Sequence, residues 1–206
     1  DADDIVQEDE FQAVPFNEKQ FAVMLDMLRS SKRPVFLLGG GADIESAHCV
    51  ERYAIENSIP VATTWNGADL ISSDCPVYIG RPNTWGQRSS NILIQQADLV
   101  ICLGTRLGLQ QTGFNWQAFV PVGKVICIEL DSSELTKGHP SIDLPILGDC
   151  NAYINRLTEV AVNQDWETWL DFCVQTRAAI PLVEEGINEN FKDFIAPQGF
   201  VTALSG

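Results

Sequence analysis

Apolar runs that end in glycine, threonine or acidic residues recur along this chain. Four of them cover residues 34–38, 59–62, 99–103 and 125–128, and shorter apolar runs lie at residues 76–79 and 144–147. Because the runs are continuous rather than alternating, and rich in β-branched residues, each predicts a strand buried on both faces of a sheet. Strands of this kind occur in parallel sheets that helices cover on both sides.

Helical patterns fill the segments between the runs. The predicted helices cover residues 17–31, 43–57, 89–97, 132–137, 151–162 and 166–179. Asn17 and Asp43 are candidate N-caps, and we expect the apolar stripe of the second helix to comprise Ile44, Ala47, Val50, Ala54 and Ile55. Strands alternating with helices predict an α/β fold with a doubly wound, mostly parallel six-stranded sheet of the Rossmann-like kind.

Glycine, hydroxyl and charged residues gather where the predicted strands end. The clusters are Gly39–Gly41, Thr63–Thr64, Gly104–Arg106, Glu129–Asp131 and Gly148–Asp149. Parallel sheets bind ligands at the carboxyl ends of their strands, so we expect these clusters to share one edge of the sheet. Glycines at such a position let a phosphate approach a helix N-terminus, and an arginine suits a phosphate or carboxylate.

Each cluster also has a purely structural interpretation. The glycine run fits a tight turn, because Ile44 stands where a dinucleotide fingerprint has its third glycine. Arg106 is suited to a surface ion pair as well as to an anion. Asp131 and Asp149 are suited to capping the short helices that follow them, so these alternatives stay open at this stage.

The charge balance limits the partners of this chain. Its formal net charge is −15 and its pI about 4.3, whereas nucleic acids and anionic membranes attract basic surfaces. No apolar run reaches the roughly 18–20 residues of a membrane span. We therefore expect no nucleic-acid and no membrane partner, and any bound phosphate must be held locally by backbone N–H groups and a few cations.

Catalytic and metal-binding patterns are missing from the sequence. The six cysteines are widely spaced with no CxxC pair, which argues against a zinc site and predicts buried free thiols in a reducing cytoplasm. No GxSxG or P-loop motif occurs. We expect structural or solvated roles for His48 and His139, and we name no catalytic residue and no metal ligand.

Two long connections carry three large aromatic residues. Trp65 and Trp85 lie in residues 64–87, and Trp116 lies in residues 104–123. Aromatic side chains at the carboxyl edge of a sheet can stack on the ring of a ligand or fill an interface. Ordinary packing within the domain is the alternative for each of them.

Five motifs, taken in order, resemble one family of enzymes. They are RPVFLLGGG at residues 33–41, IPVATT at 59–64, ADLVICLGTR at 97–106, KVICIELD at 124–131 and LGD at 147–149. Over residues 33–157 they are similar to the central domain of thiamine-diphosphate-dependent enzymes of the acetolactate synthase (acetohydroxyacid synthase) type. The stretches at residues 111–116 and 143–146 resemble the synthase-like proteins of surface-polysaccharide pathways.

The resemblance implies a division of the chain and a place in a larger enzyme. Residues 1–16 would be an acidic inter-domain linker, residues 17–162 the central domain, and residues 163–206 a connecting helix with the start of a diphosphate-binding domain. The longer protein would be a cytoplasmic homodimeric or homotetrameric transferase or lyase that decarboxylates a 2-keto acid and joins it to a second carbonyl. Thiamine diphosphate (ThDP), Mg²⁺ and the catalytic residues would belong to the neighbouring domains.

The resemblance implies a sheet of the DHS-like NAD/FAD-binding type, and in the synthase branch of the family the central domain binds FAD. The resemblance places FAD or ADP at Gly39, Gly40, Gly41, Thr63, Thr64, Gly104, Thr105, Arg106, Glu129, Gly148 and Asp149. The chain departs from the FAD pattern after Arg106, where the family's carboxylates and second arginine are replaced, and at Trp65–Gly67 and Thr84–Gly86. The alternatives are a stand-alone nucleotide-binding module, and a vestigial structural or dimerisation domain whose pocket tryptophan fills.

Overall fold

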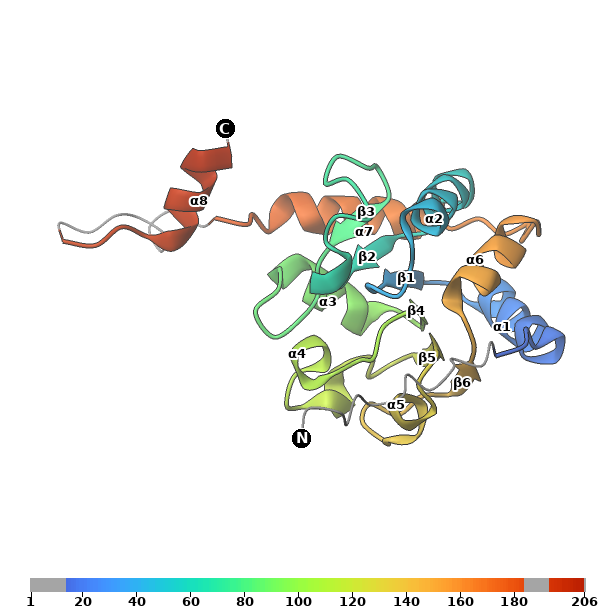
Figure 1. The fold of residues 1–206 in the computed structure, drawn as a ribbon. Coiled ribbons are helices and arrows are strands. Elements are labelled where there is room, and N and C mark those ends of the chain that lie inside the picture. Colours follow the sequence, from blue (N-terminus) through green and yellow to red (C-terminus); the bar gives the residue numbers. More distant parts are fainter. Residues whose placement is uncertain (1–13, 184–192, 206) are drawn as a thin grey trace, which may run out of the picture.

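A computed structural model describes residues 14–183 and 193–205, so most of the predicted acidic linker lies outside the described residues. Its centre is a six-stranded sheet in the order β3-β2-β1-β4-β5-β6 (Figure 1). Every neighbouring pair of strands is parallel. The predicted α/β fold with a doubly wound, Rossmann-like sheet is therefore confirmed, and the sheet is parallel throughout.

The strands follow the apolar runs closely. They are β1 (Pro34–Leu38), β2 (Val61–Thr63), β3 (Tyr78–Gly80), β4 (Leu99–Leu103), β5 (Lys124–Glu129) and β6 (Leu144–Leu147). The second strand starts two residues later than predicted, because Pro60 has no N–H to donate to a neighbouring strand. Its carbonyl still accepts a hydrogen bond from the Phe36 N–H at 3.0 Å.

Helices cover both faces of the sheet, as the continuous apolar strands require. The helices are α1 (Glu18–Ser30), α2 (Ile44–Asn57), α3 (Arg88–Gln96), α4 (Leu109–Thr112), α5 (Ser132–Thr136), α6 (Cys150–Thr158), α7 (Glu167–Ala179) and α8 (Pro197–Ser205), with 3₁₀ turns η1 (Trp65–Gly67) and η2 (Trp116–Ala118). One core cluster joins α1, α2 and α6 to one face of the sheet. A second cluster joins α3, α5 and α7 to the opposite face.

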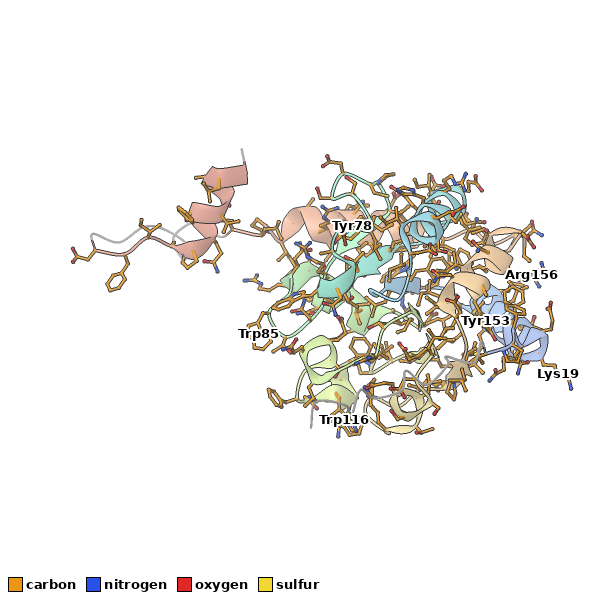
Figure 2. The ribbon with its side chains drawn as sticks, in the orientation of Figure 1. Lys19, Tyr78, Trp85, Trp116, Tyr153 and Arg156 are labelled. Atoms are coloured by element: carbon orange, nitrogen blue, oxygen red, sulfur yellow. The ribbon has the colours of Figure 1, made fainter. Side chains whose placement is uncertain are left out.

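The starts of α1 and α2 were predictable from side-chain caps, whereas α3 and α7 begin without one. Asn17 accepts hydrogen bonds from the Lys19 and Gln20 N–H groups, and Asp43 accepts one from Ser46 at 2.7 Å. The tyrosine of α6, Tyr153, lies on the α1 side of the domain (Figure 2). Its hydroxyl accepts a hydrogen bond from the Asn17 N–H at 3.1 Å, which ties the start of α1 to α6.

The predicted stripe of α2 is partly wrong. Ala47, Val50 and Ala54 are buried, but Ile44 is 65% exposed and Ile55 is 45% exposed. At 3.6 residues per turn these two isoleucines lie more than about 100° around the helix from Val50. The buried stripe instead includes Ser46 and Tyr53, because a side chain is buried by its angle toward the sheet and not by its apolarity alone.

Helix α7 packs on the same core as the elements before it. The indole N–H of Trp169 donates to the Pro34 carbonyl of β1 at 2.9 Å, and Cys173 is fully buried. Arg177 donates to the carbonyls of Tyr78 and Ser73, so it fastens the start of β3 and the loop before it to the helix. None of the described helices is long and apolar enough to cross a membrane.

All six cysteines are free, and five of them are buried. Burial raises the pKa of Cys127 and of Cys150 to about 12, because the thiolate would lose its hydration. The same cause raises the pKa of Cys75, Cys102 and Cys173. Cys49, on α2, is partly exposed. The structure therefore separates one accessible thiol from five that are both shielded and protonated at neutral pH.

We predict that a thiol reagent such as dithiobis-nitrobenzoate labels one cysteine of the native protein at pH 8, at position 49. Reaction needs both the thiolate and access, and the five buried groups have neither. All six cysteines should react in denaturant, and Cys49→Ser should abolish native labelling. Rapid native labelling of a second cysteine would contradict the packing of the core.

Candidate functional site

Two chain reversals cross at the centre of the carboxyl edge, where β1 and β4 end side by side. The Gly39 N–H donates to the Leu103 carbonyl at 2.9 Å, and the Gly41 N–H donates to the Gly104 carbonyl at 3.0 Å. A Cβ added at Gly39 would collide with the Gly104 carbonyl. The chain leaves β1 toward one side of the sheet and β4 toward the other, so this crossing is the topological switch point.

The second reversal depends on glycine for two reasons. Gly104 has φ of +64°, a left-handed conformation that glycine adopts without strain. A Cβ there would also lie 2.8 Å from the Cys150 sulfur at the start of α6. The backbone of the switch point can therefore approach both the opposite turn and a helix N-terminus.

A cavity of about 660 Å³ opens at this crossing, and we call it the cleft. It is lined by Gly40, Gly41, Thr64, Trp65, Asn66, Asn83, Gly104, Thr105, Arg106, Leu107, Gly108, Gln110, Gln111 and Glu129. Its size is in the range of small-molecule and cofactor sites. The cleft therefore brings together most of the positions that the sequence placed along the carboxyl edge.

Four of the positions assigned by resemblance do not line the cleft. Gly39 lies inside the crossing of the two turns. Thr63 is fully buried, and its hydroxyl lies 3.0 Å from the Tyr78 hydroxyl. The Gly148 N–H donates to the Glu129 carbonyl. Asp149 accepts a hydrogen bond from the Asn151 N–H at 2.9 Å, so it serves as the cap of α6.

Carboxylates cap three of the helices that start near the cleft, whereas the short helix α4 starts after Gly108 with no side-chain cap. Asp43 caps α2, Asp131 caps α5 and Asp149 caps α6. Hydrogen bonds from the Ser133 hydroxyl and N–H lower the pKa of Asp131, and the nearby Arg106 guanidinium adds to the effect. Because each cap already brings a negative charge to its helix dipole, the helix ends by themselves are poor anion sites.

The charge in the cleft comes from one residue of each sign. Among the described residues that line it, Arg106 is the only cation and Glu129 the only carboxylate. Arg106 is exposed, whereas Glu129 is half-buried and one of its oxygens accepts a hydrogen bond from the Leu130 N–H. An anionic group near Arg106 and a hydroxyl-bearing group near Glu129 would match this arrangement.

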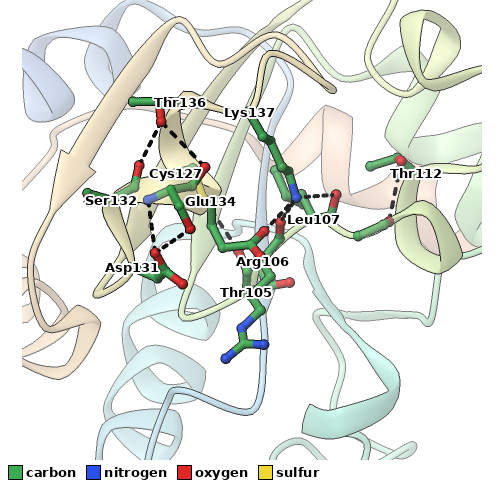
Figure 3. Close-up of polar contacts among 12 residues, drawn as sticks. Thr105, Arg106, Leu107, Thr112, Cys127, Asp131, Ser132, Glu134, Thr136 and Lys137 are labelled. Carbon is green, nitrogen blue, oxygen red and sulfur yellow. Dashed lines mark hydrogen bonds and ion pairs between the residues drawn. The ribbon is translucent and has the colours of Figure 1, made fainter.

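Lys137 holds the segment that carries Arg106. Its ammonium donates to the backbone carbonyls of Arg106 and Leu107 and pairs with Glu134 at 2.7 Å (Figure 3). All three N–H bonds of the ammonium thus have acceptors, and the side chain is only 18% exposed. The Arg106 guanidinium extends away from Lys137 in Figure 3. Lys137 therefore fixes the backbone and leaves the Arg106 side chain available.

The two long connections are joined to each other by hydrogen bonds beside the cleft. The Thr84 N–H donates to the Gln110 carbonyl at 2.8 Å, and the Gln111 side-chain amide donates to the Pro82 carbonyl. Asn83 is 5% exposed, and its side-chain oxygen accepts a hydrogen bond from the Trp85 N–H. Its Nδ2 is buried with no hydrogen-bond partner in the described part of the chain. Asn83 therefore carries a buried donor that is unsatisfied within the described residues, next to the wall of the cleft.

The tryptophans do not fill the cleft. Trp65 and Trp85 are 53% and 66% exposed, which contradicts ordinary packing for these two. Trp116 is half-buried and lies beside His139, at 6.2 Å between ring centroids. Both histidines are exposed, and no group of three or more potential metal ligands occurs among the described residues.

Sequence reasoning missed several residues of the site, among them Asn83, Gln111 and Lys137. Asn83 lies in a loop that matches no motif, Gln111 lies on the short helix α4, and Lys137 follows a short helix far from Arg106 along the chain. The single cue was the length of the two connections, because loops this long in a compact domain are usually functional.

Comparisons with known proteins agree with this fold. The family described as "Thiamine pyrophosphate enzyme, central domain" matches residues 21–157. The chain is 29% identical over 193 residues to the acetolactate synthase large subunit of Corynebacterium glutamicum, covering 91% of this chain and 30% of that protein. It is 32% identical over 184 residues to the probable acetolactate synthase large subunit of Methanocaldococcus jannaschii, covering 86% of this chain and 30% of that protein.

The chain thus spans about 30% of the length of these relatives. Thiamine pyrophosphate is the same cofactor as ThDP. The matched range contains all six strands and the whole cleft. This chain therefore belongs to the thiamine pyrophosphate enzymes, and residues 21–157 are its match to their central domain.

Proposed function

We propose that this domain binds an adenine nucleotide, FAD or ADP, in the cleft, within a ThDP-dependent enzyme that decarboxylates a 2-keto acid and forms a C–C bond. The observation that carries the proposal is the cleft itself. It opens at the switch point of a parallel sheet. Two glycine turns, the exposed Arg106 side chain and the Glu129 carboxylate lie on its walls.

The cleft suits the parts of a nucleotide. The phosphates would lie against Arg106 and the glycine turn, where the absence of side chains lets a ligand approach the backbone. Glu129 would accept hydrogen bonds from ribose hydroxyls. The open volume of about 660 Å³ favours binding over a vestigial pocket, since no tryptophan fills it.

The rest of the enzyme would carry the chemistry. ThDP with Mg²⁺ supplies the electron sink for decarboxylation when it is bound, and we propose that the groups holding it belong to neighbouring domains. We further propose that residues 17–162 act as the central domain, with 1–16 as a linker and 163–206 leading into a diphosphate-binding domain. The names of the relatives support an acetolactate-synthase-like transferase or lyase.

The proposed function also suggests a compartment, an oligomeric state and a class of partners. We propose a cytoplasmic homodimer or homotetramer with a 2-keto acid substrate and with neither nucleic acid nor membrane as a partner. The free thiols fit a reducing compartment, and the charge of −15 fits the absence of polyanion binding. A role in surface-polysaccharide metabolism rests on the resemblance of residues 111–116 and 143–146 alone.

Binding of ADP and FAD to the purified protein, measured by calorimetry, tests the nucleotide role. We expect Arg106→Met to weaken both ligands about tenfold or more, because a charge-assisted hydrogen bond to phosphate is lost. Arg52→Met is the matched control, since Arg52 is exposed on α2 and does not line the cleft. If neither nucleotide binds the wild-type protein, the proposed role of this domain is wrong.

Lys137→Met tests whether the tether, meaning the hydrogen bonds from the Lys137 ammonium to the Arg106 and Leu107 carbonyls, supports the site. The methionine keeps most of the apolar stem but leaves two carbonyls and Glu134 without their donor. We expect a loss of about 1–3 kcal/mol in the free energy of unfolding, measured in urea, together with weaker ADP binding. Lys19→Met, on the exposed side of α1, should change neither quantity. Unchanged ADP affinity in Lys137→Met would show that the Arg106 segment holds its position without the tether.

A further inference from the structure

A strained backbone conformation follows Arg106 directly. Leu107 has φ of +51°, in the left-handed region that glycine adopts freely and that a bulky side chain rarely adopts. Among the described residues, Ser58 and Asn163 are the other non-glycine residues with positive φ. Ser58 ends α2, where such a conformation is common, and asparagine tolerates it through its short polar side chain. Neither explanation applies to Leu107, so its surroundings must hold it in place.

The side chain of Leu107 is anchored in the core. It is 1% exposed and belongs to the second core cluster, together with Cys127 and Leu135. Thr105 is also buried, whereas Arg106 between them is exposed. The burial of Leu107 offsets the cost of its backbone conformation, because a glycine would relieve the strain but would leave the core without this side chain. The arginine is therefore presented between two buried neighbours.

Backbone hydrogen bonds hold the same segment. The Cys127 thiol donates to the Thr105 carbonyl at 3.4 Å, and the Lys137 ammonium donates to the next two carbonyls, those of Arg106 and Leu107. Three consecutive carbonyls are thus tied to β5 and to the residue that follows α5. None of these contacts uses the Arg106 guanidinium, which extends away from Lys137 (Figure 3).

The position of this guanidinium matters because the cleft has no other positive side chain among the described residues that line it. An arginine on a mobile loop would lose conformational freedom when it binds an anion, and that loss weakens binding. At Arg106 the backbone has already been fixed by folding, through the buried side chain of Leu107 and the contacts of Lys137. The cleft thus holds a single cation whose backbone is pre-organised.

We propose that Leu107 is a positioning residue, whose buried side chain locks the left-handed backbone that presents Arg106 to the anionic group of the ligand. The proposal rests on the proposed function, because it takes the phosphates of an adenine nucleotide as the partner of Arg106. Leu107 brings no charge and no polar side-chain atom to the cleft. Its effect on nucleotide binding passes through the arginine.

Limited proteolysis with trypsin tests the anchor without any ligand. Trypsin cleaves after an exposed arginine only where the backbone can open to enter the protease. We expect the wild type to resist cleavage between Arg106 and Leu107, and Leu107→Gly to be cut there on the order of tenfold faster, because opening costs less. Mass spectrometry identifies the cut. Leu107→Met, which keeps a long apolar side chain, should resist like the wild type.

Ser58→Gly is the matched control for Leu107→Gly. It also replaces a left-handed residue by glycine, but Ser58 does not line the cleft. It should leave both the cleavage after Arg106 and the affinity for ADP unchanged. Faster cleavage after Arg106 in this control would show that the segment responds to any change of stability, and the anchor would be wrong.

A double-mutant cycle measured by calorimetry with ADP tests the link to Arg106. We expect Leu107→Gly to weaken ADP about five- to tenfold, because the arginine must then be ordered on binding. In the Arg106→Met background the same change should cause no further loss, since the effect passes through the arginine. Leu107→Met should bind ADP like the wild type.

The outcomes separate the positioning role from the proposed function. If Leu107→Gly weakens ADP equally with and without Arg106, or leaves the ADP affinity unchanged, the positioning role is wrong and the nucleotide function stands. If cleavage after Arg106 is unchanged in Leu107→Gly, the anchor is wrong whether or not a nucleotide binds. If ADP and FAD both fail to bind the wild type, the proposed function is wrong and the nucleotide part of this proposal falls with it.

Circular dichroism and urea unfolding of each variant verify that it folds. Leu107→Ala, which keeps the Cβ but removes the rest of the anchor, takes the place of Leu107→Gly in both experiments if the glycine variant does not fold. The same outcomes then support or overturn the positioning role.

Discussion

The close crossing of the turns after β1 and β4 is the constraint on which the rest of the site depends. Gly39 meets the Gly104 carbonyl at a distance that no side chain would allow, and Gly104 itself adopts a left-handed conformation. Because the two chains then diverge to opposite faces of the sheet, a hollow is left at the switch point. The two glycines thus provide both the packing of the sheet edge and the opening of the cleft.

Everything else around the cleft is arranged by contacts to that crossing. Turn η1 packs on Gly40, α6 reaches Gly104 through Cys150, and Lys137 fastens the segment after β4 to the end of α5. The caps Asp43 and Asp149 balance the helix dipoles at its border, so the positive charge of the cleft is concentrated in Arg106. In the proposed function, such a site would select a ligand by one contact between Arg106 and an anionic group and by shape, rather than by a strong overall field.

The family match concerns the function of the whole enzyme, whereas the cleft concerns the function of this domain. Membership among the thiamine pyrophosphate enzymes describes the protein in which this domain works. The proposed nucleotide role rests on the residues of this chain, and by resemblance these depart from the FAD pattern of the synthase branch at Trp65 and Trp85. These side chains are the exposed aromatic pair beside the cleft. Departures from the pattern therefore coincide with the surface where a change of ligand preference would be seen.

The sequence by itself determined the six strands, the caps Asn17 and Asp43, the polar clusters at the carboxyl edge and the family. Short segments of the sequence determine these features, through hydrophobic periodicity, helix-capping side chains and glycine runs. Only the tertiary structure decided that Thr63 is buried, that Ile44 faces solvent, and that Asn83 and Lys137 belong to the site. Lys137 and Arg106 are 31 residues apart, and their contact arises from packing β4 beside β5. No local pattern encodes such a contact, because it exists only once the sheet has brought the loops together.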